Sequence, residues 1–236
     1  MDEKIYITGS SGMLGKNLID KLKNLGYSNL VYKTSKELNL TERQKVFDFF
    51  EKEKPVFVIH LASILGGMQD KIDNPARYLR DNLLINTNVI DACFKYNVKK
   101  LINLSSTCIY PTNAKQPANE NEFKYGPLEL INEGYALSKI VALKLCTYYN
   151  NKNANFITII APNLYGKHDH FNESGHVIPS MMCKMQNAKK NNNKDIQIWG
   201  SGNAKREFLF AEDLAEIIIM AIKIIIDNAA NEPLKP

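Results

Sequence analysis

The sequence has few of the features that mark membrane-spanning, secreted or metal-binding proteins. Its most apolar run, 214–226, contains Glu216 and Lys223 and is too short to cross a bilayer, so a buried helix is predicted there. The cysteines show neither C-x-x-C pairing nor the spacing of metal ligands; they are Cys93, Cys108, Cys146 and Cys183. These absences predict a reduced, cytoplasmic protein that holds no metal.

A large excess of charge of either sign is also lacking. Lysine and arginine total 30 and aspartate and glutamate 25, which gives a net charge of +5. The most basic run, 184–194, is interrupted by asparagine and glutamine. Nucleic-acid binding is therefore not predicted, whereas small anionic ligands suit this balance. The first residues are expected to enter a strand directly, so no signal peptide is predicted.

A glycine-rich turn follows the first predicted strand, residues 4–8. Three glycines are spaced G-x-x-G-x-x-G, and apolar positions after them predict a helix that ends at Gly26. Glycines let a backbone turn tightly against a pyrophosphate, and the following helix supplies N–H groups and positive potential. We therefore expect a dinucleotide site, with an ordinary strand-to-helix turn as the alternative. The residues assigned to this site are Gly9, Ser10, Ser11, Gly12, Met13, Leu14 and Gly15.

The end of the second predicted strand, residues 30–33, indicates which dinucleotide is bound. An NAD site usually places an acid there to hold the ribose hydroxyls. This chain instead has Lys33 and Lys36, and no acid occurs before Glu37. A cation would accept the 2′-phosphate of NADP, so NADP is favoured over NAD. The alternative is that both lysines are only solvated loop residues.

The remaining chain alternates strands and helices, which predicts parallel strands joined by right-handed crossovers. A capping box at Thr41 and Gln44 is expected to start the helix before Pro55. Further strands are predicted at 56–62, 100–105, 156–161, 196–199 and 207–210, and further helices at 75–96, 133–150 and 177–190.

Tyr135 and Lys139 are four residues apart on a predicted helix, so their side chains share one face. A nearby ammonium favours phenolate, and we therefore expect Lys139 to lower the pKa of Tyr135. The phenol could then exchange a proton with a sugar hydroxyl or carbonyl. Taken alone, such a pair also occurs by chance on many solvated helices.

The joint order of these motifs resembles the extended short-chain dehydrogenase/reductase family over nearly the whole chain. The resemblance is carried by the glycine turn, the Ser/Thr cluster 105–108 and the Tyr135–Lys139 pair. It narrows to members that epimerise and reduce a GDP-bound 4-keto-6-deoxymannose. The motifs that narrow it lie at 106–111, 163–166, 168–169, 175–179, 199–202 and 206–209. The resemblance also implies a homodimer paired through helices 75–96 and 133–150, with Leu79, Leu83, Val141 and Leu145 as compatible apolar positions; these could instead face the domain's own sheet.

The resemblance implies a role for five residues. Ser106 would bond the C4 carbonyl oxygen, Tyr135 would donate a proton during reduction by NADPH, and Lys139 would hold the nicotinamide ribose. Cys108 and His176 would be the acid/base pair that inverts C3 and C5, since both side chains can titrate near neutral pH. Thr107 is an alternative to Ser106.

The resemblance also implies further ligand contacts. Arg206 and Lys184 would bind the GDP pyrophosphate, and Trp199 would pack near the nucleotide. Alternatively, Lys184 is a helix-face lysine and Trp199 a core residue. The other cofactor contacts would come from Lys33, Ser35, Lys36, Leu40, Ala62, Leu104, Ser105, Lys139, Pro162, Asn163, Leu164 and His176.

The expected fold is α/β, a doubly wound parallel, Rossmann-like sheet with a small C-terminal substrate lobe. The NADP-binding domain would span 1–165 with 206–227 packed back onto it, and the lobe would comprise 166–205 and 228–236. Two departures from the family pattern stand out. Ala161-Pro162-Asn163 stands where the family often has Pro-Thr-Asn, and the end at Pro236 leaves the expected lobe incomplete. The alternatives are another nucleotide-sugar epimerase or reductase, or a truncated NADP-binding protein without turnover.

Overall fold

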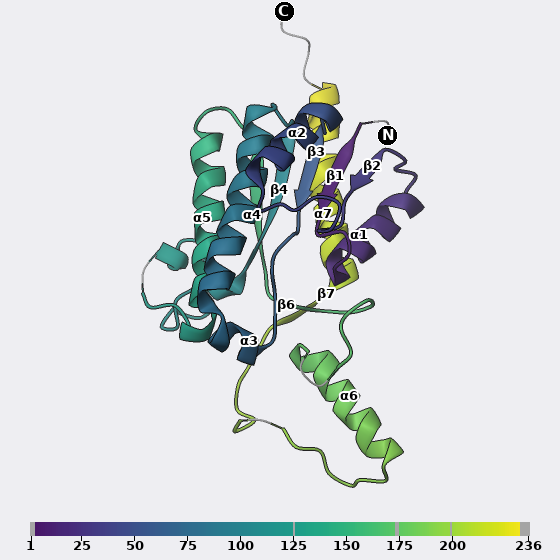
Figure 1. Ribbon diagram of the computed structural model, residues 1–236, viewed down its shortest axis with the longest axis vertical. Helices are drawn as coiled ribbons and strands as arrows, with labels where there is room; N and C mark the ends of the chain where they lie inside the picture. The colour runs from purple at the N-terminus through teal and green to yellow at the C-terminus, as the bar shows by residue number, and fades with distance from the viewer. Residues whose placement is uncertain (1–2, 125, 173–174, 199, 232–236) are drawn as a thin grey trace, which may run out of the picture.

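The computed structural model describes residues 3–124, 126–172, 175–198 and 200–231. Strands and helices alternate along the chain, as the pattern predicts (Figure 1). The elements in order are β1 (Ile5–Thr8), α1 (Met13–Asn24), β2 (Leu30–Tyr32), α2 (Arg43–Glu53), β3 (Phe57–His60), α3 (Met68–Asp73), α4 (Pro75–Lys95), β4 (Lys100–Ser106), η1 (Thr107–Ile109), η2 (Glu122–Lys124), η3 (Leu130–Asn132), α5 (Glu133–Asn150), β5 (Phe156–Ala161), β6 (Asn163–Tyr165), α6 (Val177–Lys190), β7 (Phe208–Phe210) and α7 (Ala211–Asn231).

The central sheet has five parallel strands in the order β2-β1-β3-β4-β5. The strand order reverses direction at β1, which has β2 on one side and β3 on the other. In open sheets of this kind, ligands bind beyond the carboxyl ends of the strands at such a switch point. The predicted doubly wound, Rossmann-like α/β fold is confirmed.

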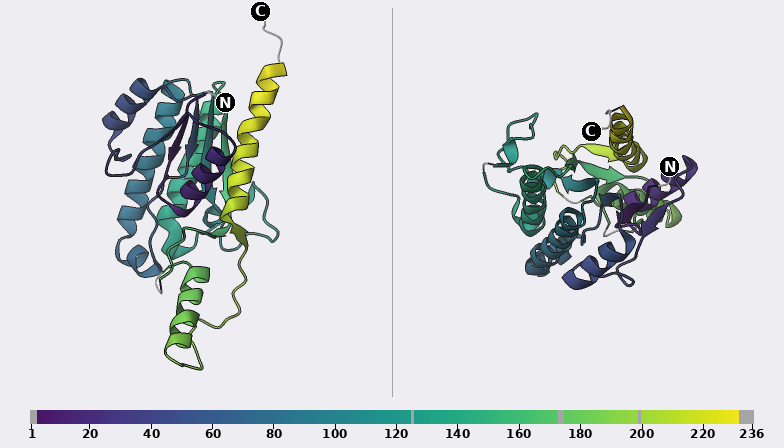
Figure 2. Two further views of the ribbon diagram at one scale, coloured as in Figure 1. Left: turned by 90° about the vertical axis from the view of Figure 1, so that its right-hand side faces the viewer. Right: turned by 90° about the horizontal axis from the view of Figure 1, so that it is seen from above.

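Helices cover both faces of the sheet, and for this reason the central strands read as continuous apolar runs. In β1, Ile5 and Ile7 pack with α1 and α7, whereas Tyr6 between them packs with α2, α4 and α5. Figure 2 shows the sheet enclosed between these two helical layers. Because successive side chains in a strand point to opposite faces, each strand contributes to both halves of the core.

The end of the described chain returns to the sheet. Helix α7 packs beside α1, where Leu214, Ile218 and Ile222 are buried. Among the described residues, no helix is long and apolar enough to cross a membrane. Strands β6 and β7 form a separate two-stranded parallel sheet. The chain between them contains α6, which lies beyond the carboxyl edge of the main sheet (Figure 1). The division into two domains stays a prediction.

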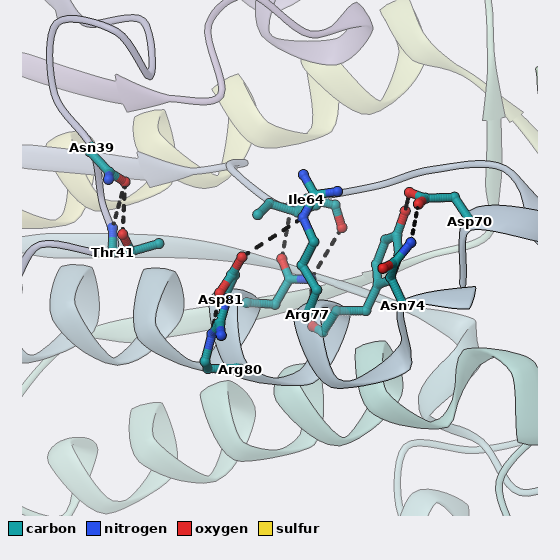
Figure 3. A network of polar contacts seen from close by, with 10 residues as sticks. Asn39, Thr41, Ile64, Asp70, Asn74, Arg77, Arg80 and Asp81 are labelled. Carbon is teal, nitrogen blue, oxygen red and sulfur yellow. Dashed lines mark hydrogen bonds and ion pairs between the residues drawn. The ribbon is translucent and has the colours of Figure 1, made fainter. Parts of the chain in front are cut away.

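Two expectations for local structure are wrong, and one strand was not predicted. Helix α2 begins after Glu42 without a side-chain cap, and Thr41 instead donates hydrogen bonds from its N–H and Oγ1 to Asn39 Oδ1 at 3.1 and 2.9 Å (Figure 3). A nearby asparagine therefore outcompetes the predicted capping box. The strand predicted at 196–199 is absent from residues 196–198, which the structure describes. Strand β6 was not predicted, because it pairs with a strand more than 40 residues away (Asn163 with Phe208).

Candidate active site

The carboxyl ends of four strands meet on one edge of the sheet. Strand register aligns Thr8 with His60 and His60 with Asn103, and it aligns Ser106 with Ala161. The residues that follow these positions therefore surround one region. The structure accordingly brings together the glycine turn after β1, Ala62 after β3, Leu104 and Ser105 in β4, and Pro162 after β5.

The glycine turn is packed too tightly for other residue types at two positions. Gly9 has φ +69°, and a Cβ there would lie 2.8 Å from the Ala62 backbone nitrogen. A Cβ at Gly15 would collide with the carbonyl oxygen of Gly9, because α1 starts directly against the turn. The N–H of Gly12 donates to Gly9 O at 3.1 Å and closes the turn. A cradle of this shape, at a helix N-terminus, fits a pyrophosphate.

The segment after β2 runs beside this turn. Ser10 Oγ lies 3.4 Å from the Lys33 carbonyl oxygen, and Asn88 Nδ2 donates to Leu40 O at 2.9 Å. Lys33 Nζ lies 3.5 Å from Glu37 Oε1, and both side chains are well exposed. Backbone and hydroxyl bonds to Thr34 lower the pKa of Glu37. The backbone of Lys33 thus lies beside the turn, and its ammonium is paired with the Glu37 carboxylate.

The loop between β3 and α3 is held against α4. Asn82 is fully buried, and its amide accepts from the Ile64 N–H at 2.8 Å and donates to the Ile64 carbonyl at 3.1 Å. Asp70 accepts hydrogen bonds from the Tyr78 hydroxyl and from Asn74 Nδ2, the latter at 2.9 Å (Figure 3). These bonds fasten the loop and α3 to α4.

A buried chain of hydrogen bonds connects β1 to α5. Thr8 Oγ1 accepts the N–H groups of Leu61 and Ala62, both at 3.1 Å, so its own proton goes to His60 Nδ1 at 2.8 Å. His60 Nε2 then carries the proton and donates to Asn86 Oδ1 at 3.1 Å. Asn86 Nδ2 in turn donates to the Ser138 carbonyl at 3.2 Å. Burial, followed by the charge of Lys139, lowers the pKa of His60 to about 3.

Tyr135 and Lys139 share one face of α5, as predicted. Lys139 Nζ lies 5.6 Å from the centre of the Tyr135 ring and donates to Leu104 O at 2.9 Å. The expected effect on the phenol is wrong, however. Burial raises the pKa of Tyr135, the charge of Cys108 adds to this rise, and the Ser63 hydroxyl only partly opposes it. Desolvation therefore outweighs the neighbouring cation, and Tyr135 stays protonated.

Ser106 and Cys108 lie at the end of β4, in front of this pair. Ser106 caps η1, with its Oγ 3.5 Å from the Cys108 N–H. Burial raises the pKa of the Cys108 thiol, whereas the Ser106 side chain and the cations Lys139 and Lys71 lower it. The Ser105 hydroxyl is buried and has no hydrogen-bond partner in the part of the chain that the structure describes.

The proposed residues of the substrate lobe lie apart from this cluster. His176 is the N-cap of α6, its side chain is 59% exposed, and its Nδ1 lies 3.7 Å from Asp169 Oδ1. Lys184 Nζ donates to the Gln197 carbonyl at 3.1 Å, and Arg206 is exposed. Trp199 lies outside the described residues. The structure thus brings Ser106, Cys108, Tyr135 and Lys139 together. It does not bring His176 to them, because the contact described for His176 is with Asp169.

Two residues near the cluster were not singled out from the sequence. His60 could have been noticed as a polar residue that ends an otherwise apolar strand. Lys71 in α3 is half-buried and interacts electrostatically with Cys108. No sequence pattern marks Lys71, because α3 has only six residues and contains no buried position.

Several known proteins are similar to this chain in sequence and fold. The profile of the NAD dependent epimerase/dehydratase family matches residues 5–232. GDP-L-colitose synthase of Yersinia pseudotuberculosis is 40% identical over 93% of this chain and 72% of its own length. GDP-L-fucose synthase of Azorhizobium caulinodans is 39% identical over 94% of this chain and 72% of its length. A crystal structure of a GDP-L-fucose synthetase from Naegleria fowleri bound to NADP superimposes with a TM-score of 0.85 and 33% identity, over 94% of this chain and 73% of that one.

Proposed function

Because this chain belongs to the NAD dependent epimerase/dehydratase family, we propose that it is an NADPH-dependent enzyme that makes GDP-L-fucose. It epimerises GDP-4-keto-6-deoxy-D-mannose at C3 and C5 and reduces the product at C4. The observation that carries this proposal is the position of Cys108. Its thiol lies within the electrostatic reach of both Lys139 and Tyr135, so a candidate base for epimerisation sits beside the pair suited to reduction.

The epimerisation uses the acidity that a C4 ketone gives to both neighbouring carbons. The Cys108 thiolate removes the proton from C3 or C5, and the resulting negative charge collects on the C4 oxygen near Ser106. We assign to His176, which the structure describes beside Asp169 and apart from Cys108, the return of a proton to the opposite face of the same carbon, which inverts the centre. General acid–base steps of this kind contribute about 10²- to 10⁴-fold to a rate.

The reduction uses the other pair of side chains. NADPH, when bound, supplies the hydride to C4. Tyr135 gives its phenolic proton to the C4 oxygen, a role that suits a phenol whose pKa is raised by burial. The Lys139 cation stabilises the phenolate that remains, and its bond to Leu104 O holds it in place.

The site fits NADP by its shape and by its donors. The cradle at Gly9 and Gly15 admits a pyrophosphate, and Lys33 and Lys36 offer cations to a 2′-phosphate. We assign the adjoining contacts to Ser10, Ala62, Leu104, Ser105 and Pro162, whose positions border the same edge of the sheet.

Incubation with NADPH and GDP-4-keto-6-deoxymannose, with NMR identification of the product, tests the proposal. GDP-L-fucose is expected. Reduction without inversion at C3 and C5 would favour a different nucleotide-sugar reductase. NADPH binding without turnover would favour a binding protein, and Arg206 and Lys184 would then lose their proposed role toward the GDP pyrophosphate.

We also propose that the protein is a cytoplasmic homodimer that pairs through α4 and α5. Leu84 on α4 and Leu137 and Val141 on α5 are each 38–39% exposed, so both helices carry apolar side chains that the chain itself leaves partly uncovered. Leu145, by contrast, packs against the protein's own core. Light scattering at micromolar concentration checks the dimer, and a monomer there would contradict it.

A further inference from the structure

The buried hydrogen-bond chain between β1 and α5 begins at the wall of the pyrophosphate cradle. Its members are each 1% exposed or less; they are Thr8, His60, Asn86 and Ser138. Thr8 directly precedes Gly9, and its Oγ1 accepts from the Ala62 N–H at 3.1 Å. The Ala62 nitrogen is also the atom that a Cβ at Gly9 would approach to 2.8 Å. One end of the hydrogen-bond chain is therefore anchored in the glycine turn.

The other end of the hydrogen-bond chain reaches the peptide group in front of Lys139. Asn86 Nδ2 donates to the Ser138 carbonyl oxygen at 3.2 Å. Because a peptide group is planar, this oxygen and the backbone nitrogen of Lys139 belong to one rigid unit. The Ser138 hydroxyl in turn donates to the Tyr135 carbonyl oxygen at 2.7 Å. Asn86 of α4 thus contacts α5 at the point from which Lys139 projects, about one turn after Tyr135.

The donors of the hydrogen-bond chain all point in one direction. The Thr8 oxygen already accepts two backbone N–H groups, so its own proton goes to His60. His60 then donates to Asn86 Oδ1, which leaves the Asn86 amide nitrogen to face the Ser138 carbonyl. Reversing the direction would place two acceptors face to face at Ser138. A buried network that is satisfied in only one arrangement specifies how α4 and α5 lie more sharply than apolar packing alone.

We propose that Asn86 is a positioning residue that fixes Lys139 and Tyr135 relative to a cofactor held in the glycine turn. The inference rests on the proposed function for what these two side chains do. Lys139 holds the nicotinamide ribose and Tyr135 faces the C4 oxygen, whereas the turn holds the pyrophosphate of the same cofactor. The two groups of contacts must therefore keep their separation. A misplacement of about 1 Å in such a site can lower a rate by about 10²-fold.

Cofactor affinity tests the proposal without a sugar nucleotide. Asn86→Leu nearly keeps the size of the side chain and removes its hydrogen bonds to His60 and Ser138. This variant should bind NADPH about three- to tenfold more weakly, because Lys139 meets the ribose less well. It should bind 2′-phosphoadenosine 5′-diphosphate, which lacks the second ribose, as the wild type does. Val89→Ala is the matched control, because it trims a buried apolar side chain of the same helix and leaves the hydrogen-bond chain intact.

Turnover separates positioning from a loss of stability. In Asn86→Leu, kcat for reduction at C4 should fall by up to about 10²-fold while KM for the GDP-sugar stays close to the wild-type value. Val89→Ala should change neither constant. His60→Leu should resemble Asn86→Leu. His60→Gln keeps an acceptor for Thr8 and a donor for Asn86, so it should recover most of the activity that His60→Leu loses.

The wild type provides a measurement that no folding defect can affect. NMR of the His60 ring nitrogens should find the proton on Nε2; a proton on Nδ1 would reverse the hydrogen-bond chain and overturn the proposal. Equal NADPH affinity and equal kcat in Asn86→Leu and Val89→Ala would also overturn it. Should Asn86→Leu not fold, equal values in His60→Leu and His60→Gln would do so instead. If the wild type binds NADPH but does not convert the GDP-sugar, the proposed function fails, and the two affinities still decide the role of Asn86.

Discussion

Lys139 Nζ donates a 2.9 Å hydrogen bond to the carbonyl oxygen of Leu104, which ties the middle of α5 to the end of β4. The lysine is 2% exposed, and burial lowers its pKa to about 8. A lysine in water titrates near pH 10.4. The bond therefore fixes the position of a cation that burial makes easy to lose.

The rate of C4 reduction is expected to fall as the pH rises through about 8. Below that value Lys139 is charged and stabilises the phenolate left by proton donation; above it the cation is lost. NADPH oxidation at saturating substrate across pH 6–10 measures the effect. Lys139→Met should be slow at every pH, by about 10² or more. Lys100→Met is the control, because Lys100 lies at the other end of β4 and is equally buried. This variant should keep the decline in rate at alkaline pH. If the decline disappears in Lys100→Met, the assignment to Lys139 is contradicted.

The free energy of unfolding should decrease as the pH falls from about 6.5 toward 3. The folded state holds His60 neutral, with a pKa of about 3, whereas an unfolded histidine binds a proton near pH 6.5. Between these values the unfolded chain holds one more proton, so this residue alone costs up to about 1.4 kcal/mol per pH unit. Above pH 6.5 it has no effect. Urea midpoints measured at several pH values test this.

His60→Gln is the matched variant for this measurement. A glutamine oxygen can accept from Thr8 and its nitrogen can donate to Asn86, which keeps the polarity of the hydrogen-bond chain without titration. The variant should lose about 1–2 kcal/mol at pH 7 through imperfect packing. Its stability should nevertheless depend less on pH between 3 and 6.5. An unchanged pH dependence would assign the acid sensitivity to other groups.

Sequence reasoning succeeded where one local pattern determines the structure. β1 is buried on both faces and reads as an unbroken apolar run, and the i, i+4 spacing puts Tyr135 and Lys139 on one helical face. It failed at two residues for different reasons. Asn39, only two residues away, takes the hydrogen bonds of Thr41, a local competition that the capping-box pattern does not include. Burial raises the pKa of Tyr135, and that burial depends on tertiary contacts that no short window of sequence contains.

The protein is expected to bind NADPH more tightly than NADH because of Lys33 and Lys36. Each exposed cation should contribute up to about 1 kcal/mol toward the 2′-phosphate, or roughly fivefold in affinity. Titration of Lys33→Gln and Lys36→Gln with both cofactors should show weaker NADPH binding and unchanged NADH binding. Lys45→Gln, which removes an exposed lysine paired with Glu42, serves as the control. Equal binding of both cofactors by the wild type would remove the argument.

Cys108→Ser and Tyr135→Phe should separate the two reactions. A serine hydroxyl nearly matches the thiol in shape, but its proton is far harder to remove, so Cys108→Ser should lose deuterium exchange at C3 and C5 by about 10²-fold or more. It should still reduce the unepimerised ketone slowly. Phenylalanine keeps the ring of Tyr135 and removes the only proton it could give to the C4 oxygen. Tyr135→Phe should therefore retain exchange while NADPH oxidation falls by a similar factor.

The outcome of this pair of variants decides the role of the cysteine. Deuterium incorporation is followed by NMR and NADPH oxidation by absorbance, in the same solutions. Cys183→Ser removes a thiol in α6, outside the cluster around Cys108, and should change neither reaction. If Cys108→Ser exchanges normally at both carbons, the cysteine is structural, although the charges of Lys139 and Lys71 lower the pKa of its thiol. Proton removal would then have to start from another side chain, and the assignment of epimerase activity to this cluster would fail, whereas the role of Tyr135 in reduction would be unaffected.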